Sequence, residues 1–396
     1  MKCSTPLWQW RDLYSNQNFF SIPKAHTHFL TSQKSRVRAT AAIASRCLSL
    51  SVNNNITTTQ VLTSNPETDN IINSSLVKDS NSQVSKILLG RSEAELRQIA
   101  KELGQQTYRG KQLHDLLYKV KAQNLEEYSQ LPLKFREDLR NAGWKVGRSP
   151  IHHSVTATDG TIKVLLRLED SRLIETVGIP VIEEGGSTRL TACVSSQVGC
   201  PLRCTFCATG KGGYSRNLKP HEIIEQDVKI GQRMITISTV GVPNTIKKLA
   251  TYKLQSTLAI SLHAPNQKLR ETIVPSAKSY PLESLMKDCR DYFEETGRRV
   301  SFEYTLLAGV NDSPEHASEL ADMLHRWGRG HHVNLIPFNP IAGSDFQRPY
   351  KKVLMAFAET LERHKVTTSI RHTRGLDANA ACGQLRNEYQ KVPLAT

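Results

Sequence analysis

Long apolar stretches are missing from this sequence of 396 residues. A membrane-spanning helix needs at least about 18 consecutive, mostly apolar residues, and because no part of the chain provides them we expect no membrane span. Cysteine is also scarce, since 8 residues are too few for the disulfide scaffold of a small secreted protein. Collagen-like and wholly disordered chains are excluded as well. What remains is a soluble globular protein, long enough for two or three domains.

Acidic residues are nearly absent from the first 66 positions, where Asp12 is the only one. This stretch has a net charge of +6, and the rest of the chain holds +9 of the total of +15. Its basic residues are Lys2, Arg11, Lys24, Lys34, Arg36, Arg38 and Arg46. An arginine-bearing, acid-poor segment rich in serine and threonine is typical of an organelle transit peptide, and residues 37–41 resemble a stromal processing site. The alternative is a disordered tail.

We therefore expect residues 1–85 to be a transit peptide and linker that lie outside the fold. The protein would act in the chloroplast stroma, with the mitochondrion as the second choice of compartment. The charge of +9 that remains after this segment is removed indicates a polyanionic partner, and nucleic acid is the one that such a basic balance favours.

Residues 86–150 are predicted to form a small helical domain. Ser92 and Glu95 have the spacing of a capping box, apolar residues on one helical face follow them, and Gly104 is a stop signal. Two more helices are predicted, at about 111–121 and 133–142. Seven of the basic residues in this domain are candidates for RNA binding, and they are equally compatible with an ordinary solvated surface. They are Arg109, Lys111, Lys119, Lys121, Lys134, Arg136 and Arg140.

From residue 154 the apolar pattern changes to a period of two, which predicts a β-rich connector over 151–189 with strands at 162–168 and 173–179. After residue 189, strand-like and helical segments alternate. The strands are predicted at 190–195, 234–240, 257–262, 300–307, 332–336 and 366–371, and the helices at 221–228, 245–252, 282–295, 314–327 and 351–364. This alternation predicts a parallel sheet with crossover helices, either open or curved into a barrel.

Four cysteines fall within fifteen positions, from Cys193 to Cys207, and three of them, Cys200, Cys204 and Cys207, have the spacing C-x3-C-x2-C. Three thiolates so close together can bind three irons of a [4Fe–4S] cluster and leave the fourth iron open to a chelating substrate. Zinc is the competing interpretation. A structural zinc site usually has two C-x2-C pairs, and here there is no second pair, with only His221 nearby.

With this spacing just after the first strand of the alternating region, the sequence resembles the radical S-adenosylmethionine superfamily, and more closely the RlmN/Cfr-type adenine methyltransferases. The segment from Cys193 to Cys200 and the blocks at 260–265, 334–340, 371–375 and 381–385 resemble that family in the same order. The resemblance runs from about residue 87 to 385. It implies an α/β fold with a partial (β/α) barrel over 190–385, preceded by an RNA-binding helical domain and followed by a tail at 386–396.

The resemblance also implies the chemistry. In this family one S-adenosylmethionine methylates a C-terminal cysteine, here Cys382, and a second is cleaved on the [4Fe–4S] cluster to a 5′-deoxyadenosyl radical. That radical takes hydrogen from the methyl group, and the carbon radical so formed adds to C2 of an adenine in ribosomal or transfer RNA. Cys193 matches the second cysteine that resolves the adduct, through a transient disulfide with Cys382. Glu175 matches the general base.

Five further residues match positions that line the S-adenosylmethionine site, and they fall at or just after strand ends, where parallel α/β folds build their sites. They are Ser238, Ser261, Leu262, His263 and Asn339. Arg371 and Arg374 are candidates for holding RNA phosphates. The implied partners are ribosomal RNA, transfer RNA or both, and an electron donor such as ferredoxin or flavodoxin. We expect the enzyme to be a monomer.

One unit of the family pattern is missing. The family has a further strand and helix after the cysteine loop, and that strand ends in a Gly-Glu-Pro motif at the methionine end of the cofactor. Here Gln226 runs directly into Asp227, so about 30 residues or more, the size of a strand–crossover unit, are absent. We expect the strands at 190–195 and 234–240 to pair directly as a result.

We interpret the chain as the product of an exon-skipped transcript or of a mispredicted gene model of a true methyltransferase. Two alternatives remain open. The first is a non-catalytic RNA-binding isoform, and the second is a radical enzyme with another substrate, such as a glycyl-radical activase. The pair Cys193 and Cys382 argues against the activase, because abstraction of hydrogen from a glycine needs neither thiol.

Overall fold

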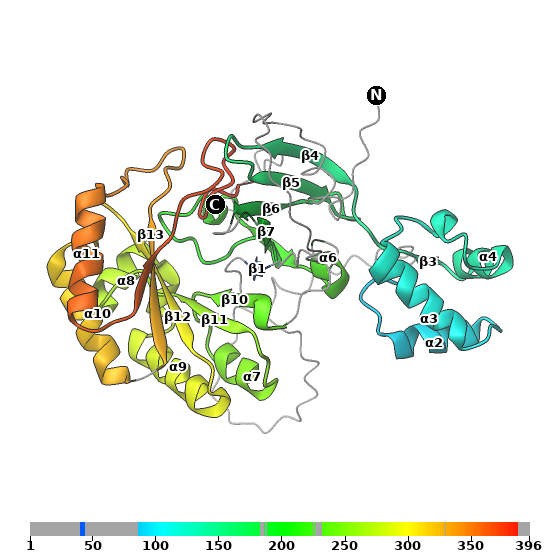
Figure 1. The fold of residues 1–396 in the computed structure, drawn as a ribbon, viewed down its shortest axis with the longest axis horizontal. Coiled ribbons are helices and arrows are strands. Elements are labelled where there is room, and N and C mark those ends of the chain that lie inside the picture. The colour runs from blue at the N-terminus through cyan, green and yellow to red at the C-terminus, as the bar shows by residue number, and fades with distance from the viewer. Residues whose placement is uncertain are drawn as a thin grey trace, which may run out of the picture. The chain divides into compact units, whose positions relative to one another are not determined.

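The computed structural model describes residues 40–43, 86–182, 186, 188–224, 226, 232–328 and 330–386. These residues belong to two compact units, which are treated separately here: residues 86–146 form the smaller one, and residues 40–43 together with those after 146 form the larger one (Figure 1). The proposed tail lies almost entirely outside the described residues, as does most of the proposed transit segment. No helix among the described residues has the length and apolar character that crossing a bilayer requires.

The smaller unit is the expected helical domain. Its helices are α2 (Glu93–Glu102), α3 (Tyr108–Asp115), which continues as a π-helical turn (Leu116–Val120), and α4 (Leu133–Asn141), and a short parallel pair joins β2 (Lys86–Ile87) to β3 (Trp144–Lys145). The capping box is confirmed, because the Ser92 hydroxyl accepts from the Glu95 amide while the Glu95 carboxylate accepts from the Ser92 amide. Gly110 lets α3 approach α2, since a Cβ there would lie 2.3 Å from the Arg97 Cα.

Ten strands of the larger unit form one sheet, in the order β14-β13-β12-β11-β10-β1-β7-β6-β5-β4. The strands are β1 (Thr40–Ile43), β4 (Ile151–Thr156), β5 (Ile162–Arg167), β6 (Leu173–Ile182), β7 (Thr188–Val194), β10 (Ile235–Thr239), β11 (Thr257–Ser261), β12 (Val300–Leu306), β13 (His331–Pro337) and β14 (Thr368–Ile370). Strands β4 to β7 pair antiparallel and the rest pair parallel. The connector is therefore continuous with the sheet of the core.

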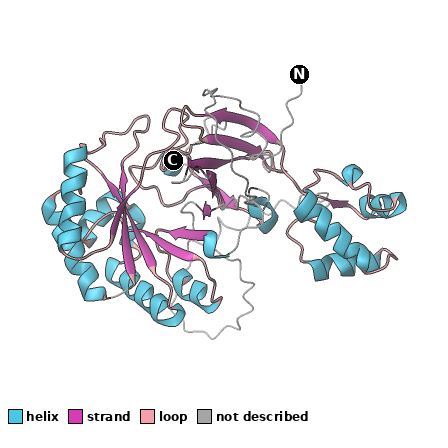
Figure 2. Ribbon diagram, in the orientation of Figure 1, coloured by secondary structure: helices cyan, strands magenta, loops and turns pink. Residues whose placement is uncertain are grey.

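Helices connect the parallel strands and form an outer layer around them (Figure 2). They are α5 (Ala208–Lys211), α6 (Pro220–Ile224), α7 (Thr245–Thr251), α8 (Gln267–Ile273), α9 (Leu282–Thr296), α10 (Pro314–Trp327) and α11 (Lys351–Arg363). The main core lies between this layer and strands β11 to β13, and Leu258, Phe302, Leu335, Leu320 and Phe357 are fully buried in it. This is the alternating α/β architecture that the sequence predicts.

One prediction is wrong. Strands β7 and β10 do not pair with each other, because β1 lies between them and pairs parallel with both, Thr40–Ile43 with Thr191–Val194 of β7 and Ala41–Ile43 with Ile235–Ile237 of β10. The physical reason is that a sheet missing an inner strand leaves two rows of unpaired amide and carbonyl groups, and any extended segment can satisfy both. Four residues of the segment expected outside the fold thus complete the sheet.

Candidate functional site

The cysteine loop follows the short strand β8 (Gln197–Gly199), which pairs with β9 (Tyr214–Asn217). The Cys200 amide donates to the Gly213 carbonyl over 2.8 Å, and the Cys207 amide donates to the Cys204 carbonyl over 3.1 Å. Gly199 has a left-handed φ of 77°, and a Cβ there would lie 1.9 Å from the Gly213 oxygen, so no other residue fits. Backbone contacts at both ends therefore hold the loop in one conformation.

The three thiols of this loop share one largely apolar environment. Cys200 is buried, and Cys204 and Cys207 are half-buried against the side chains of Phe206, Val240, Ala264 and Phe338. Burial raises the pKa of the Cys204 thiol, and its neighbours Cys207 and Cys200 raise it further, because thiolates so close together repel one another. Such a group of thiols gains from a metal centre that neutralises all three as thiolates.

This donor set fits an iron–sulfur cluster. Soft thiolates are the ligands that such clusters use, and each of the three would bind a different iron of the cube. Among the described residues no three His, Cys, Asp or Glu side chains are grouped around one point as ligands of a single ion would be. His221, the only histidine near the motif in sequence, lies on α6, where burial lowers the pKa of its imidazole.

His263 lies just after β11, in a left-handed conformation with φ of 63°. Its Nδ1 accepts a hydrogen bond from the Thr305 amide over 3.0 Å, and its ring meets that of Phe206 edge-on at 4.8 Å. Burial lowers the pKa of His263 to about 3, and the nearby cation Arg270 contributes. The imidazole is therefore neutral, with its proton on Nε2, and it contacts the cysteine loop through Phe206.

The other predicted cofactor residues lie at the same ends of the parallel strands. Ser261 and Leu262 are buried at the end of β11, and Ser238 is half-buried on β10. Ser238 of β10 lies beside Ala259 of β11 in the register, and Ser261 lies two residues after Ala259 on the same strand. Both serines therefore lie on one face of the sheet. The structure thus brings these residues to one edge, as the sequence predicts.

A polar row on that face was not predicted. Glu303 of β12 lies in register between Ser261 and Asn334, and its carboxylate accepts from Asn334 Nδ2 over 2.7 Å and from Ser301 Oγ over 2.8 Å. Ser369 extends the row by donating to Asn334 Oδ1 over 3.1 Å. The signal that could have found it is the alternation of polar residues with apolar ones along the strand at 300–307.

Asn339 joins the end of β13 to the segment that carries Cys382. Its Nδ2 donates to the Cys382 carbonyl over 3.0 Å, and its Oδ1 accepts from Thr373 Oγ1 over 3.0 Å. On the other side, the Ala208 amide donates to the Gly383 carbonyl over 2.8 Å, directly after the cysteine loop. Residues 381–385 are therefore held between β13 and the start of α5, which places Cys382 beside the predicted cluster ligands.

Cys382 opens into a cavity of about 280 Å³. Thr191 of β7 lines this cavity together with Asn339, Arg371 and Arg374. The Cys382 side chain is exposed to it. The surrounding protein nevertheless raises the pKa of its thiol by desolvation, whereas the charge of Arg371 acts to lower it. The charge of Arg371 thus favours the thiolate form of Cys382. The thiolate is the nucleophilic form of a cysteine.

Cys193 lies next to this cavity. It follows Thr191 by two residues on β7, on the same face, opposite Val177 in the antiparallel register. Arg371 interacts electrostatically with Cys193 as well as with Cys382. Within the described residues, neither cysteine takes part in a disulfide bond. The expected transient disulfide between them stays a prediction.

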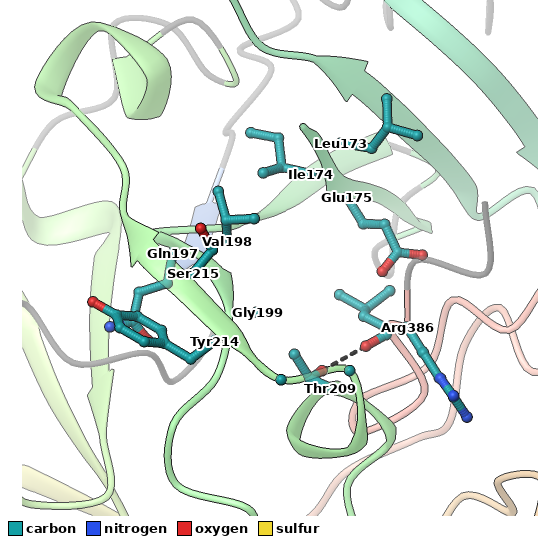
Figure 3. Close-up of a pocket in the computed structure, with 13 residues that line it drawn as sticks. Leu173, Ile174, Glu175, Gln197, Val198, Gly199, Thr209, Tyr214, Ser215 and Arg386 are labelled. Atoms are coloured by element: carbon teal, nitrogen blue, oxygen red, sulfur yellow. Dashed lines mark hydrogen bonds between the residues drawn. The ribbon is translucent and has the colours of Figure 1, made fainter. Parts of the chain in front are cut away.

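Glu175 lies on β6, two residues before Val177 on the same face, and it is buried with Lys163 Nζ 3.4 Å from its carboxylate. It does not line the cavity of Cys382. It lines a separate one of about 60 Å³, and its carboxylate extends toward the chain at Arg386 (Figure 3). Leu385, whose carbonyl accepts from Thr209 Oγ1 over 2.6 Å, packs in the same small core as Val177. Glu175 and Cys382 therefore line different cavities, and Leu385 lies at the one that Glu175 lines.

The arginine and lysine residues predicted for RNA fall into two groups. Arg374 lines the cavity of Cys382 beside Arg371. In the helical unit, Lys119 pairs with Asp115 and Arg140 with Glu126, so part of that basic charge is neutralised within the unit.

No family model matches the chain. The chain is 50% identical over 339 residues to a probable dual-specificity RNA methyltransferase RlmN of Thermosynechococcus vestitus, which covers 76% of this chain and 98% of that protein. A protein with the same description from Gloeobacter violaceus is 49% identical over 338 residues, 76% of this chain and 94% of that one. Because 76% of 396 residues is about 301, some 38 of the 339 aligned positions have no residue in this chain.

The fold agrees with these sequence relationships. The crystal structure of a radical SAM methyltransferase from Sphaerobacter thermophilus matches with a TM-score of 0.71 and 36% identity, over 76% of this chain and 99% of that one. The relative at half identity is covered almost from end to end by this chain. This chain belongs to the RlmN family of radical S-adenosylmethionine RNA methyltransferases.

Proposed function

We propose that this protein methylates C2 of an adenine in ribosomal RNA, and in transfer RNA as well, with Cys382 as the methyl acceptor. The observation that carries the proposal is the clamp on residues 381–385, formed by Asn339 on one side and Ala208 and Thr209 on the other. This clamp holds the Cys382 thiol at a cavity and next to the loop that carries Cys200, Cys204 and Cys207. A cysteine without a chemical role would need neither the cavity nor the three neighbouring thiols.

Cys200, Cys204 and Cys207 would hold a [4Fe–4S] cluster, and Ser238, Ser261, Leu262, His263 and Asn339 would line the S-adenosylmethionine site. When bound, the cluster and S-adenosylmethionine supply the methyl group and the one-electron chemistry that activates it. The neutral His263 can only donate from Nε2, since Nδ1 already accepts from the Thr305 amide.

The chain's own side chains prepare the acceptor. Cys382 must lose its thiol proton before it can take a methyl group, and Arg371 favours that loss. Cys193 lies on β7, on the same face as Thr191, which lines the cavity of Cys382. It would resolve the RNA adduct through a transient disulfide with Cys382. Glu175 is the proposed general base, and it lines a cavity other than the one into which Cys382 opens.

We also propose the compartment in which the enzyme acts, its electron donor and the residues that hold its RNA. The acid-poor N-terminal segment supports import into the plastid stroma, with the mitochondrion as the alternative, and a stromal ferredoxin or flavodoxin would supply the electron. We also propose that the enzyme acts as a monomer. The arginines beside the cavity, Arg371 and Arg374, would hold RNA phosphates near Cys382.

A second candidate is a non-catalytic RNA-binding isoform. It is favoured by the junction of Gln226 and Asp227 and by the 339 aligned positions that this chain fills with only about 301 residues. The missing part would include the strand that ends in Gly-Glu-Pro. If the contact of the Gly-Glu-Pro motif with S-adenosylmethionine is essential, the chain still binds the cluster and the RNA but does not cleave S-adenosylmethionine.

Anaerobic cluster reconstitution, followed by assays for 5′-deoxyadenosine and for methylated adenine in RNA, tests these proposals. Formation of both products by the wild type, with loss of RNA methylation in Cys382→Ala, supports the methyltransferase. A cluster without 5′-deoxyadenosine supports the non-catalytic isoform. 5′-Deoxyadenosine without RNA methylation, with both RNA classes supplied, supports another substrate. Peptide mass spectrometry of the source tissue decides whether the short form, with a peptide spanning Gln226 and Asp227, is made.

A further inference from the structure

Arg270, on α8, has the largest fully buried side chain among the described residues and is only 1% exposed. Its guanidinium donates three hydrogen bonds, all to backbone carbonyls: from Nε to Leu262 over 3.1 Å, and from Nη2 to Val240 over 2.7 Å and to Ser261 over 3.3 Å. These carbonyls lie at the ends of β10 and β11. Arg270 therefore fastens together the two strand ends that carry the predicted cofactor residues.

The charge of Arg270 has no acidic partner in the part of the chain that the structure describes, since none of its ion pairs includes this residue. Burial lowers the pKa of the guanidinium to about 10, so it is still protonated at neutral pH. An isolated buried charge costs several kcal/mol, and protein interiors normally pair it with an opposite charge. Three neutral carbonyls accept from Nε and Nη2 of the guanidinium but do not compensate its charge.

The cysteine loop packs directly on the helix that carries this charge. The Thr205 amide and hydroxyl both donate to the Ile273 carbonyl of α8, over 3.1 and 3.2 Å. Cys204 and Cys207 belong to the same apolar group as Ile273 and Leu269 of that helix. Arg270 and Cys204 act electrostatically on each other, with Arg270 favouring the Cys204 thiolate.

We propose that Arg270 is the buried counter-charge of the iron–sulfur cluster held by Cys200, Cys204 and Cys207, and that it raises the reduction potential of that cluster. The inference rests on the proposed function, which supplies the cluster. Three thiolates around an oxidised [4Fe–4S] core leave an excess of one negative charge, and reduction adds a second. A nearby buried cation stabilises the reduced form more than the oxidised form, because net charge and surroundings set the potential of such clusters.

The competing role is purely structural, with Arg270 as a strap for three carbonyls. Substitution by lysine separates the two roles, because lysine can replace the charge of Arg270 but not its set of hydrogen bonds. Lysine keeps the charge, but its ammonium group lacks the planar fork that reaches carbonyls of two strands at once. Glutamine keeps some hydrogen bonding and loses the charge. The matched control is Lys268→Gln, which removes one positive charge from the same helix at an exposed position, where water screens it.

The experiment is an anaerobic redox titration of the reconstituted full-length protein, monitored by the EPR signal of the reduced cluster, for the wild type and the three variants. Circular dichroism and thermal melting of the cluster-free proteins establish that each one folds. We expect Arg270→Gln to shift the midpoint potential to more negative values, Arg270→Lys to stay close to the wild type, and Lys268→Gln to be unchanged. If a folded glutamine variant fails to retain the cluster, Arg270→Lys decides, because it keeps the charge and loses the planar fork.

A folded Arg270→Gln protein that holds its cluster at the wild-type potential overturns the proposal. If the glutamine variant does not fold, the lysine variant decides: a potential close to the wild type supports the charge, and a clear negative shift despite the retained charge overturns it. A wild-type protein that forms no cluster would instead contradict the proposed function. The two failures are therefore distinguishable.

Discussion

The side-chain nitrogen of Asn339 donates a hydrogen bond to the carbonyl oxygen of Cys382, 3.0 Å away. Asn339 is nearly buried at the end of β13, whereas Cys382 lies in an irregular segment close to the end of the described chain. A rigid strand end thus positions the residue that we propose as the methyl acceptor. The oxygen of the same amide accepts from Thr373, so the side chain is held at both ends.

Asn339→Ala is expected to loosen residues 381–385. Removal of the amide leaves the Cys382 carbonyl without this donor, at a cost of about 1–3 kcal/mol in the free energy of unfolding. It also frees the thiol to move, so iodoacetamide should alkylate Cys382 faster than in the wild type, as measured by mass spectrometry of the cluster-free protein. Thr373→Val is the control, because it removes only the bond on the far side. Equal alkylation rates in all three proteins would contradict the clamp.

Lys163 and Glu175 form a buried ion pair, 3.4 Å apart, on neighbouring strands. Lys163→Met should lower the free energy of unfolding by about 3–5 kcal/mol, because it leaves a buried carboxylate without its cation. Urea unfolding at neutral pH measures this effect. The Lys163 ammonium also donates to the Asn379 carbonyl over 3.2 Å, so part of the loss comes from the segment before Cys382.

The double variant Lys163→Met with Glu175→Gln separates the two contributions. It removes both charges, and we expect it to be more stable than Lys163→Met alone, since no unpaired charge is left. The single variant Glu175→Gln should fold but lose RNA methylation if Glu175 is the general base. A double variant no more stable than Lys163→Met would show that the pair does not interact energetically.

Much of this fold follows from local patterns in the sequence. The helix predicted at 314–327 is α10 (Pro314–Trp327), residue for residue, because Ser313 caps it and Pro314 begins it. The strands predicted at 257–262 and 300–307 match β11 and β12 to within one residue. Apolar residues with a clear period and well-marked caps determine such elements locally, without help from distant parts of the chain.

Features that depend on distant contacts could not be predicted in this way. Arg270 lies on an amphipathic helix among Lys268 and Glu271, where its charge suggests a surface position, and only its packing against the ends of two strands shows that it is buried. The place of β1 in the sheet depends on a gap formed by other strands. That Glu175 and Cys382 line different cavities likewise depends on contacts between distant parts of the chain.

His263 predicts a pH dependence of stability. Its pKa is about 3 in the folded protein, against an ordinary value of about 6.5 in the unfolded chain. The unfolded state therefore binds the extra proton first, so stability is full above pH 6.5 and falls as the pH drops from 6.5 toward 3, by up to about 1.4 kcal/mol for each pH unit. Urea unfolding of the cluster-free protein at pH 7 and pH 5.5 measures the loss.

His263→Asn isolates this contribution from those of the other histidines. Asparagine tolerates the left-handed backbone of this position, and its side-chain oxygen can accept from the Thr305 amide. The variant should be less stable than the wild type at pH 7, and the difference should shrink by about 1 kcal/mol at pH 5.5. An identical pH slope in both proteins would mean that His263 is protonated in the folded state.

The junction of Gln226 and Asp227 offers the sharpest test of what this chain can do. Gln226 is buried, and its side chain bonds both the amide and the carbonyl of Ser195, directly after β7, over 2.8 and 2.9 Å. The chain is therefore well anchored up to the point where the unit is missing. Insertion of the corresponding segment of the Thermosynechococcus vestitus relative after Gln226 should supply the missing strand between β7 and β10, the position that β1 now occupies.

We expect this chimera, once reconstituted with iron and sulfide, to form 5′-deoxyadenosine at least tenfold faster than the present chain, because the resemblance to the family implies a Gly-Glu-Pro motif for the cofactor at the end of that strand. A glycine- and serine-rich insert of equal length is the control for the effect of length alone, and a chimera with the glutamate of that motif changed to alanine is the control for the contact. Equal rates for the present chain and the chimera would show that β1 already completes a competent barrel and that the missing unit is dispensable.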